Sequence, residues 1–151
     1  MKVLKRLTAV LLATVMMVSM GLSVFAAAPG NYNVSATLCK DAGGNQTSMG
    51  NNGIASVKAT VKEGNLVDIE IKTKPMIFNN QEGQLDAVSL YDKAAGEEYV
   101  GTQNPGDDLT FYITNFPANE FDANKVIRGD FTSVMGKRTG YLRINAMNAI
   151  N

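Results

Sequence analysis

The chain has 151 residues, with 14 Lys and Arg against 14 Asp and Glu, and no run of basic residues of the kind that marks a nucleic-acid surface. It contains no histidine, no tryptophan and a single cysteine, which excludes Ser-His-Asp and Cys-His catalysis, histidine-bound metal and an internal disulfide. The remaining chemistry rests on carboxylates, hydroxyls, amines and thioethers, so the composition favours a binding protein over an enzyme.

The first 28 residues have the pattern of a secretory signal peptide. It begins with the cations Lys2, Lys5 and Arg6, continues with an apolar run at 7–25 and ends with three alanines at 26–28. An uncleaved membrane anchor is the alternative, because the apolar run approaches the roughly 20 residues that span a bilayer. Cleavage leaves 11 basic against 14 acidic residues, a formal charge of −3. We therefore expect one secreted or cell-surface-associated domain over residues 29–151, without a membrane span after cleavage.

Apolar and polar residues alternate in short runs that are broken by Gly, Asn, Asp and Pro, which is typical of an all-β sandwich or barrel. The clearest run is "VDIEIKT", where Val67, Ile69 and Ile71 share one face. Similar runs bring the count to about eight strands: YNVSATL, ASVKATVKE, VDIEIKT, LDAVSLYD, EEYVGT, LTFYITNF, VIRGDFTSV and GYLRIN. No helical period of useful length accompanies them.

The stretch "KDAGGNQTSMGNNG", residues 40–53, is rich in turn formers and too long for a tight hairpin. It is either a surface connection or a place for binding residues, as long loops on rigid β scaffolds often are. Asp41, Asn45 and Thr47 alternate like calcium ligands, but the glycine and the terminal glutamate of a calcium loop are missing. Cys39, just before this loop, is expected to pack as a small apolar residue.

The last two strands are predicted to form a hairpin with its loop at residues 136–140. This register sets Met135 opposite Tyr141 on one face and Val134 opposite Leu142 on the other. The second face is the more apolar and should meet the core. Tyr141 is then expected to point outward, beside a thioether.

Lys137 and Arg138 would lie above this outward tyrosine. An aromatic patch rimmed by cations suits a flat, apolar, carboxylated ligand. A cross-strand Met–Tyr pair that merely stabilises an exposed sheet is the alternative, and a one-residue bulge would turn Tyr141 inward.

Three features together resemble a NEAT (near iron transporter) domain: "YNVSATLCKDAGGNQTSM", the strands that follow it, and a terminal "F-x-x-x-x-G-x-x-x-x-Y-L-R-I" hairpin. The resemblance spans about Asn31 to Ala146. It implies an immunoglobulin-like antiparallel β-sandwich of about eight strands, secreted or displayed by a Gram-positive bacterium. It also implies a role in capturing haem, taken from a haemoprotein donor.

In that family haem lies between a short helical turn with a Ser-Met pair and the last hairpin. The resemblance gives these roles to Ser48, whose hydroxyl would hydrogen-bond a propionate, and to Met49, whose side chain would pack on the porphyrin face. Lys137 and Arg138 would pair with propionates.

The family's last hairpin carries Tyr-x-x-x-Tyr, whose first tyrosine binds ferric iron as a phenolate. Tyr141 matches the second tyrosine, and Lys137 stands at the first position. Deprotonating a lysine at pH 7 costs about 4 to 5 kcal/mol, which disfavours Lys137 as the ligand. Tyr141 and Met135 are left as candidate iron ligands. The alternative is a chain that no longer binds haem and instead recognises a protein or surface component.

No enzymatic activity is expected. A hydrolase would need two carboxylates that face one bond, whereas the acidic pairs at 97–98 and 107–108 are adjacent in sequence, so their side chains diverge. No sorting motif or hydrophobic tail follows the last strand, so we expect free secretion or non-covalent retention at the surface.

Overall fold

The structure, a computed structural model, describes residues 27–78 and 80–151. Most of the predicted signal peptide, residues 1–26, lies outside the described residues. Ten strands and one short 3-10 turn follow: β1 (Gly30–Cys39), η1 (Met49–Gly53), β2 (Ile54–Lys62), β3 (Leu66–Thr73), β4 (Met76–Phe78), β5 (Gln81–Gly83), β6 (Leu85–Tyr91), β7 (Glu98–Val100), β8 (Thr110–Pro117), β9 (Val126–Ser133) and β10 (Gly136–Ala149). Within the described ranges, no helix has the length and apolar character needed to cross a membrane.

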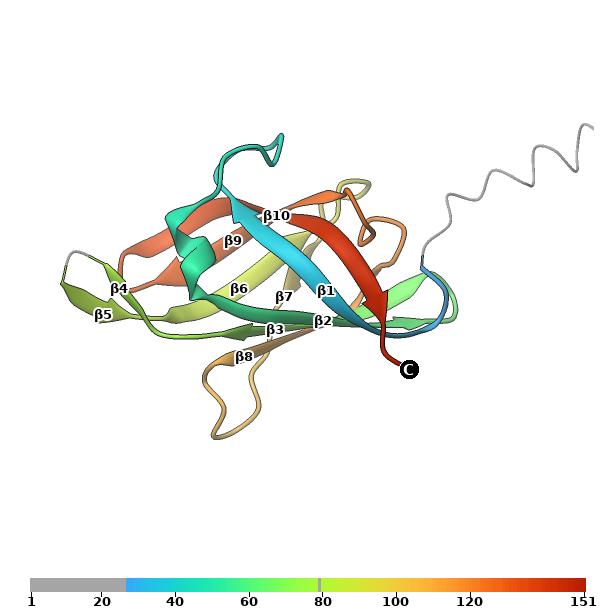
Figure 1. Cartoon of the computed structure of the whole chain (residues 1–151), viewed down its shortest axis with the longest axis horizontal. Helices are drawn as coiled ribbons and strands as arrows, with labels where there is room; N and C mark the ends of the chain where they lie inside the picture. Colours follow the sequence, from blue (N-terminus) through green and yellow to red (C-terminus); the bar gives the residue numbers. More distant parts are fainter. Residues whose placement is uncertain (1–26, 79) are drawn as a thin grey trace, which may run out of the picture.

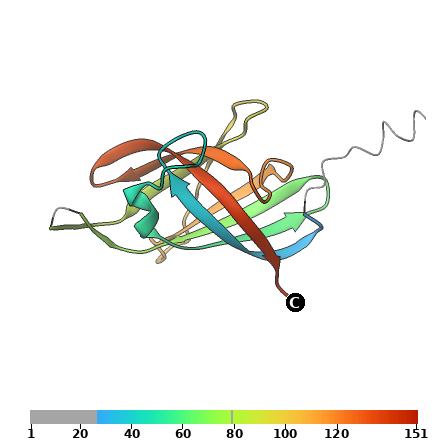
Figure 2. The same ribbon diagram turned by 45° about the horizontal axis from the view of Figure 1, so that its top comes forward.

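Eight strands pair antiparallel in one continuous sheet with the order β7-β6-β9-β10-β1-β2-β3-β8, while β4 and β5 form a separate hairpin. The sheet curls until its ends meet, giving a nearly closed barrel with sandwich-like walls (Figures 1 and 2). Beyond β7, Thr102 bridges Tyr112 on β8, and the Gly101 N–H donates to the Val88 carbonyl on β6 at 2.8 Å. Closure leaves few unpaired strand edges. The predicted all-β, antiparallel architecture is confirmed, with eight strands in the main sheet and two more in the β4–β5 hairpin.

One apolar core fills the interior, because alternate residues of every wall point inward. Val67, Ile69 and Ile71 are fully buried, as their pattern predicts. Three aromatic rings pack edge to face nearby, with centroids 5.0 Å apart for Tyr99 and Phe116 and 6.5 Å apart for Phe116 and Phe121. Each large apolar side chain removed from water contributes about 1.5–3 kcal/mol, so this core is the main source of stability.

The last hairpin is tighter than predicted, and the predicted loop at residues 136–140 is wrong. Ser133 pairs with Gly136, so the connection is the two-residue turn Val134-Met135, and the strand already begins at Gly136. Tyr141 lies opposite Arg128 on β9, not opposite Met135. The prediction assigns Gly136 and Gly140 to the loop, and this places the loop too far along the chain.

The two glycines in fact serve different purposes. Gly136, directly after the turn, has φ +87°, a conformation that side chains disfavour. Gly140 lies within the strand, where an added Cβ would come 3.0 Å from Leu38 Cδ1 and 3.2 Å from the Phe131 ring. It is therefore a packing glycine, which allows β10 to approach the core.

The outward orientation of Tyr141 is confirmed. Its neighbour Leu142 and Ile144 are completely buried, so the alternating Tyr141 points to the outer face of the barrel, where it is half-buried. Val134, which was expected to share the core face with Leu142, is instead exposed in the turn.

Candidate binding site

Three segments that are distant in sequence frame one end of the barrel: η1, the β4–β5 hairpin and the β9–β10 turn (Figure 1). They are packed closely at two glycines. An added Cβ on Gly53 would lie 2.7 Å from the Met76 sulfur, and one on Gly83 would lie 2.8 Å from Val134 Cγ2. The β4–β5 hairpin is therefore wedged between η1 and the turn, and no larger residue fits at either contact without a shift.

Exposed apolar side chains gather at this end. Four of the six large apolar residues that are exposed among the described residues belong to these three segments: Met49 (70% exposed), Ile77 (80%), Val134 (64%) and Met135 (47%). Single exposed apolar residues are common, but several from converging segments mark an interaction surface. These four residues are termed the apolar rim.

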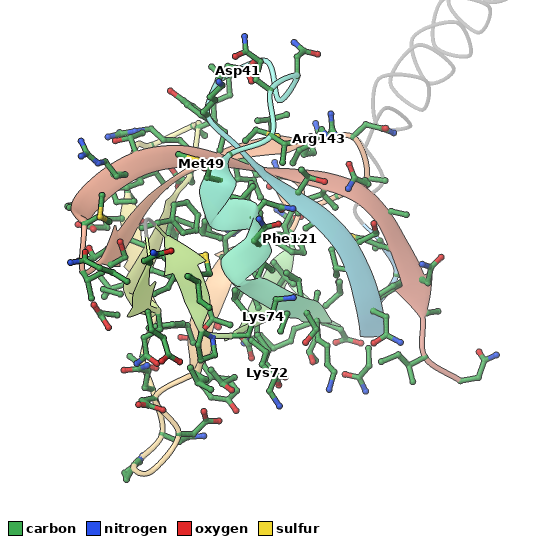
Figure 3. All side chains as sticks on the ribbon, turned by 60° about the vertical axis from the view of Figure 1, so that its left-hand side comes forward. Asp41, Met49, Lys72, Lys74, Phe121 and Arg143 are labelled. Carbon is green, nitrogen blue, oxygen red and sulfur yellow. The ribbon has the colours of Figure 1, made fainter. Side chains whose placement is uncertain are left out.

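The short turn η1 is held firmly against β1. Ser48 is its N-cap, and the Ser48 hydroxyl accepts a hydrogen bond from the Gly50 N–H at 3.2 Å. The Ser48 N–H donates to the Leu38 carbonyl at 2.8 Å, and the Leu38 N–H donates to Asn51 Oδ1 at 2.8 Å. The resemblance implied a helical turn at this Ser-Met pair, and η1 begins there, with Met49 directed to solvent (Figure 3).

Leu38 links η1 to the last hairpin. Its Cδ2 would lie 3.3 Å from a Cβ on Gly50, and its Cδ1 would lie 3.0 Å from a Cβ on Gly140. Gly140 thus faces the side of β10 that η1 covers. Arg138 is two residues away on the same strand, so it shares that side, and it is exposed near the strand's start. The structure therefore places Ser48, Met49 and Arg138 around the same end of the barrel.

A polar cluster lies on the opposite, outer side of the same hairpin. The carboxylate of Asp130 is buried, and it accepts hydrogen bonds from Lys137 Nζ, Thr139 Oγ1 and the Tyr91 hydroxyl, each at 2.9 Å. The Arg128 guanidinium stacks over the Tyr91 ring, 4.4 Å from its centroid. These five residues are termed the outer-wall cluster.

Electrostatics within the outer-wall cluster fix the charge states. Burial alone would raise the pKa of Asp130, but the hydrogen bonds from Lys137, Thr139 and Tyr91 outweigh it and lower that pKa below its usual value. The hydrogen bond to Asp130 raises the pKa of Lys137, and the same carboxylate raises the pKa of Tyr91 to about 12. Lys137 is thus a charged partner of Asp130, which opposes any role as a neutral metal ligand.

The predicted site residues are consequently divided between two faces. Ser48, Met49 and Arg138 belong to the open end, whereas Lys137 and Tyr141 point to the outer wall, and Met135 lies in the turn between the faces. The predicted grouping of Tyr141 with Met135 and with both loop cations is not formed.

Several residues of both faces escaped sequence reasoning. Ile77 and Val134 complete the rim, and Asp130 organises the outer wall. The signal for Asp130 was an acid directly before the apolar Phe131 in a strand, and the signal for Ile77 was a short apolar stretch after Pro75.

The loop after β1 is organised by its own side chains. Asp41 accepts hydrogen bonds from the N–H groups of Gln46 at 2.7 Å and Asn45 at 3.1 Å, which lower its pKa. Arg143 donates to the Gly44 carbonyl at 2.5 Å and ties the loop to β10. Cys39 is completely buried beneath it, as predicted, and burial raises the pKa of its thiol. Figure 3 shows Asp41 in the loop and Arg143 below it.

The open end fits some properties of a haem and lacks others. Apolar side chains, a hydroxyl and a guanidinium suit a flat macrocycle that carries carboxylates. Within the described part of the chain, no cluster of three or more His, Cys, Asp or Glu could hold a metal ion. The iron donors available on the rim are the thioethers of Met49 and Met135, since the phenol of Tyr141 is on the outer wall.

No protein-family model matches the chain, and no curated protein matches it. The fold and the rim define a small antiparallel β domain with an exposed apolar end.

Proposed function

We propose that this protein is a secreted or surface-associated, non-enzymatic domain of NEAT type that binds haem at the apolar rim. The observation that carries the proposal is the convergence of Met49, Ile77, Val134 and Met135 from three segments around one end. Burial of such a patch by a flat apolar ligand would recover about 25 cal/mol for each Å² removed from water.

Each rim neighbour has a defined role in this proposal. The hydroxyl of Ser48 and the guanidinium of Arg138 would bind the propionates. The Ser48 hydroxyl can donate a hydrogen bond to a carboxylate while it accepts one from the Gly50 N–H, and a guanidinium pairs with carboxylates. Met49 would pack on the macrocycle. Met135 would offer its thioether to the iron, a soft ligand that favours the ferrous state. The iron would be carried as part of the bound haem, and the chain itself would catalyse no reaction.

Recognition of a protein or a surface component without cofactor is the second candidate. The placement of the hairpin residues favours it. Lys137 is engaged by Asp130, and Tyr141 faces away from the side that η1 covers, so the phenolate used by the family is not at the rim.

Absorbance spectroscopy with added haemin separates the two candidates. Haem binding predicts a Soret band that saturates at one equivalent and weakens in the double variant Met49→Ala, Met135→Ala. Val100→Ala is the control, because the exposure of Val100 (61%) lies between those of the two methionines and Val100 lies on β7, away from the rim. The absence of a saturable band at micromolar concentrations would overturn the haem proposal and leave protein recognition.

A further inference from the structure

A second surface feature lies on the outer face of β2, β3 and β8. A groove of about 420 Å³ opens there, and Ile150, whose N–H donates to the Asn31 carbonyl at 2.8 Å, forms part of its rim. Ligand sites in proteins occupy roughly 300–1,000 Å³, so the groove is large enough for a small ligand. Its principal side chains are Asn31, Lys58, Thr60, Asp68, Glu70 and Tyr112.

Strand register arranges these side chains in two parallel rows. Asn31 lies opposite Thr60, which lies opposite Asp68 on the next strand. Two residues along, Lys58 lies opposite Glu70, which lies opposite Tyr112. Residues between the rows point into the core, so every member of both rows is directed outward.

The rows provide donors and acceptors in balance. Lys58 Nζ lies 3.8 Å from Glu70 Oε1, and the Thr60 hydroxyl donates to Asn31 Oδ1 at 2.9 Å. Asp68 accepts from Lys62 Nζ at 2.7 Å. Lys58 is the one cation in the groove lining, and Lys62, which lies outside the lining, offsets the second carboxylate by pairing with Asp68. Both carboxylates therefore have a cationic partner, which leaves little charge with which to select an ionic ligand.

Tyr112 gives the polar groove one flat apolar surface. The residue is half-buried, and its backbone exchanges two hydrogen bonds with Thr102 at the seam of the barrel, at 2.9 and 2.8 Å. Tyr112 is therefore anchored through its backbone, and its outward side chain ends the row that contains Lys58 and Glu70. A solvated sheet face explains the charges, whereas a groove that places an aromatic side chain beside them favours a ligand with a flat apolar face.

We propose that this groove binds a neutral glycan chain of flat pyranose rings. Such rings carry hydroxyl groups around their edges, which act as both donors and acceptors, and C–H groups on their faces. The edges match the balanced polar rows, and the C–H face matches the Tyr112 ring. The site is separate from the apolar rim and does not depend on haem binding.

The test is a nuclear magnetic resonance titration of residues 29–151 with the hexasaccharides of β-1,4-linked glucose and of β-1,4-linked N-acetylglucosamine. At least one probe is expected to shift amide signals of β2, β3 and β8 in a saturable manner. Tyr112→Ala should weaken binding by about tenfold, whereas Tyr112→Phe, which keeps the ring, should weaken it less.

Thr60→Ala tests the groove, and Thr132→Ala is its matched control. Both residues are outward threonines, but Thr132 lies on β9, so only Thr60→Ala should weaken binding. Thermal unfolding of each variant shows whether it is folded. The proposal is overturned if neither probe gives saturable shifts at millimolar concentration, if the shifts map to other strands, or if Thr132→Ala weakens binding as much as Thr60→Ala.

Discussion

The ammonium of Lys137 lies 2.9 Å from the buried carboxylate of Asp130, and the bond joins β10 to β9 on the outer wall of the barrel. The position at which the resemblance places an iron-binding tyrosine is therefore occupied by one half of an ion pair. Tyr141, four residues further along, is on the same wall. These two residues are not available to the rim, which is why Ser48, Met49, Met135 and Arg138 are the residues proposed to bind the ligand.

Asp130→Asn is expected to destabilise the domain by about 1–3 kcal/mol, because a buried acceptor of three hydrogen bonds loses its charge. Chemical denaturation measures the change in the free energy of unfolding. Asp86→Asn, on an exposed position of β6, serves as the control and should change it little. Equal effects of the two substitutions would show that the Asp130 network contributes no more than a surface carboxylate.

The stabilisation by Asp130 should depend on pH in a defined direction. Its pKa is lower in the folded state than the usual value near 3.9, so its contribution is complete above about pH 4 and is lost as the pH falls through the folded-state pKa. The difference in unfolding free energy between wild type and Asp130→Asn should shrink on acidification. A difference that stays constant down to pH 2 would contradict the lowered pKa.

Tyr91 should ionise only well above pH 10. Its pKa is raised to about 12 by the hydrogen bond to Asp130, so the stability that it contributes is complete below about pH 10 and is lost as the pH rises toward 12. Spectrophotometric titration of tyrosinate absorbance, compared with Tyr91→Phe, measures this. Loss of a component that titrates near pH 10 in the variant would disprove the shift.

Gly140→Ala should destabilise the domain by about 1–3 kcal/mol, because the new methyl group overpacks Leu38 and Phe131. Gly136→Ala is the informative comparison. It has open space around it but a positive φ, and should cost about 1 kcal/mol through backbone strain alone. Thermal or chemical unfolding ranks the two. A larger cost for Gly136→Ala would mean that the core relaxes around residue 140.

Alternation along the chain predicted the strands and their buried faces well, because both depend on local sequence. Val67, Ile69 and Ile71 are an example. The register of the last hairpin was not predictable in this way, since glycines serve turns and close packing alike, and Gly140 serves packing.

The site was harder to predict than the strands. The rim depends on the approach of Met49, Ile77 and Val134 from three separate segments, and the partners of Asp130 come from β6 and β10. The contacts of Asp130 follow from the strand order β6-β9-β10, and the rim follows from the packing of three separate segments at one end of the barrel. No local pattern contains them.

Selective labelling of methionine methyl groups shows whether haem lies at the apolar rim. The expected domain contains Met49, Met76, Met135 and Met147, of which Met147 lies along β10 opposite Val34 and away from the turn. Addition of haemin should broaden the methyl signals of Met49 and Met135 through the paramagnetic iron and leave Met147 sharp. Broadening of Met147 with Met49 and Met135 unchanged, or no selective broadening at all, would show that haem does not lie at the rim.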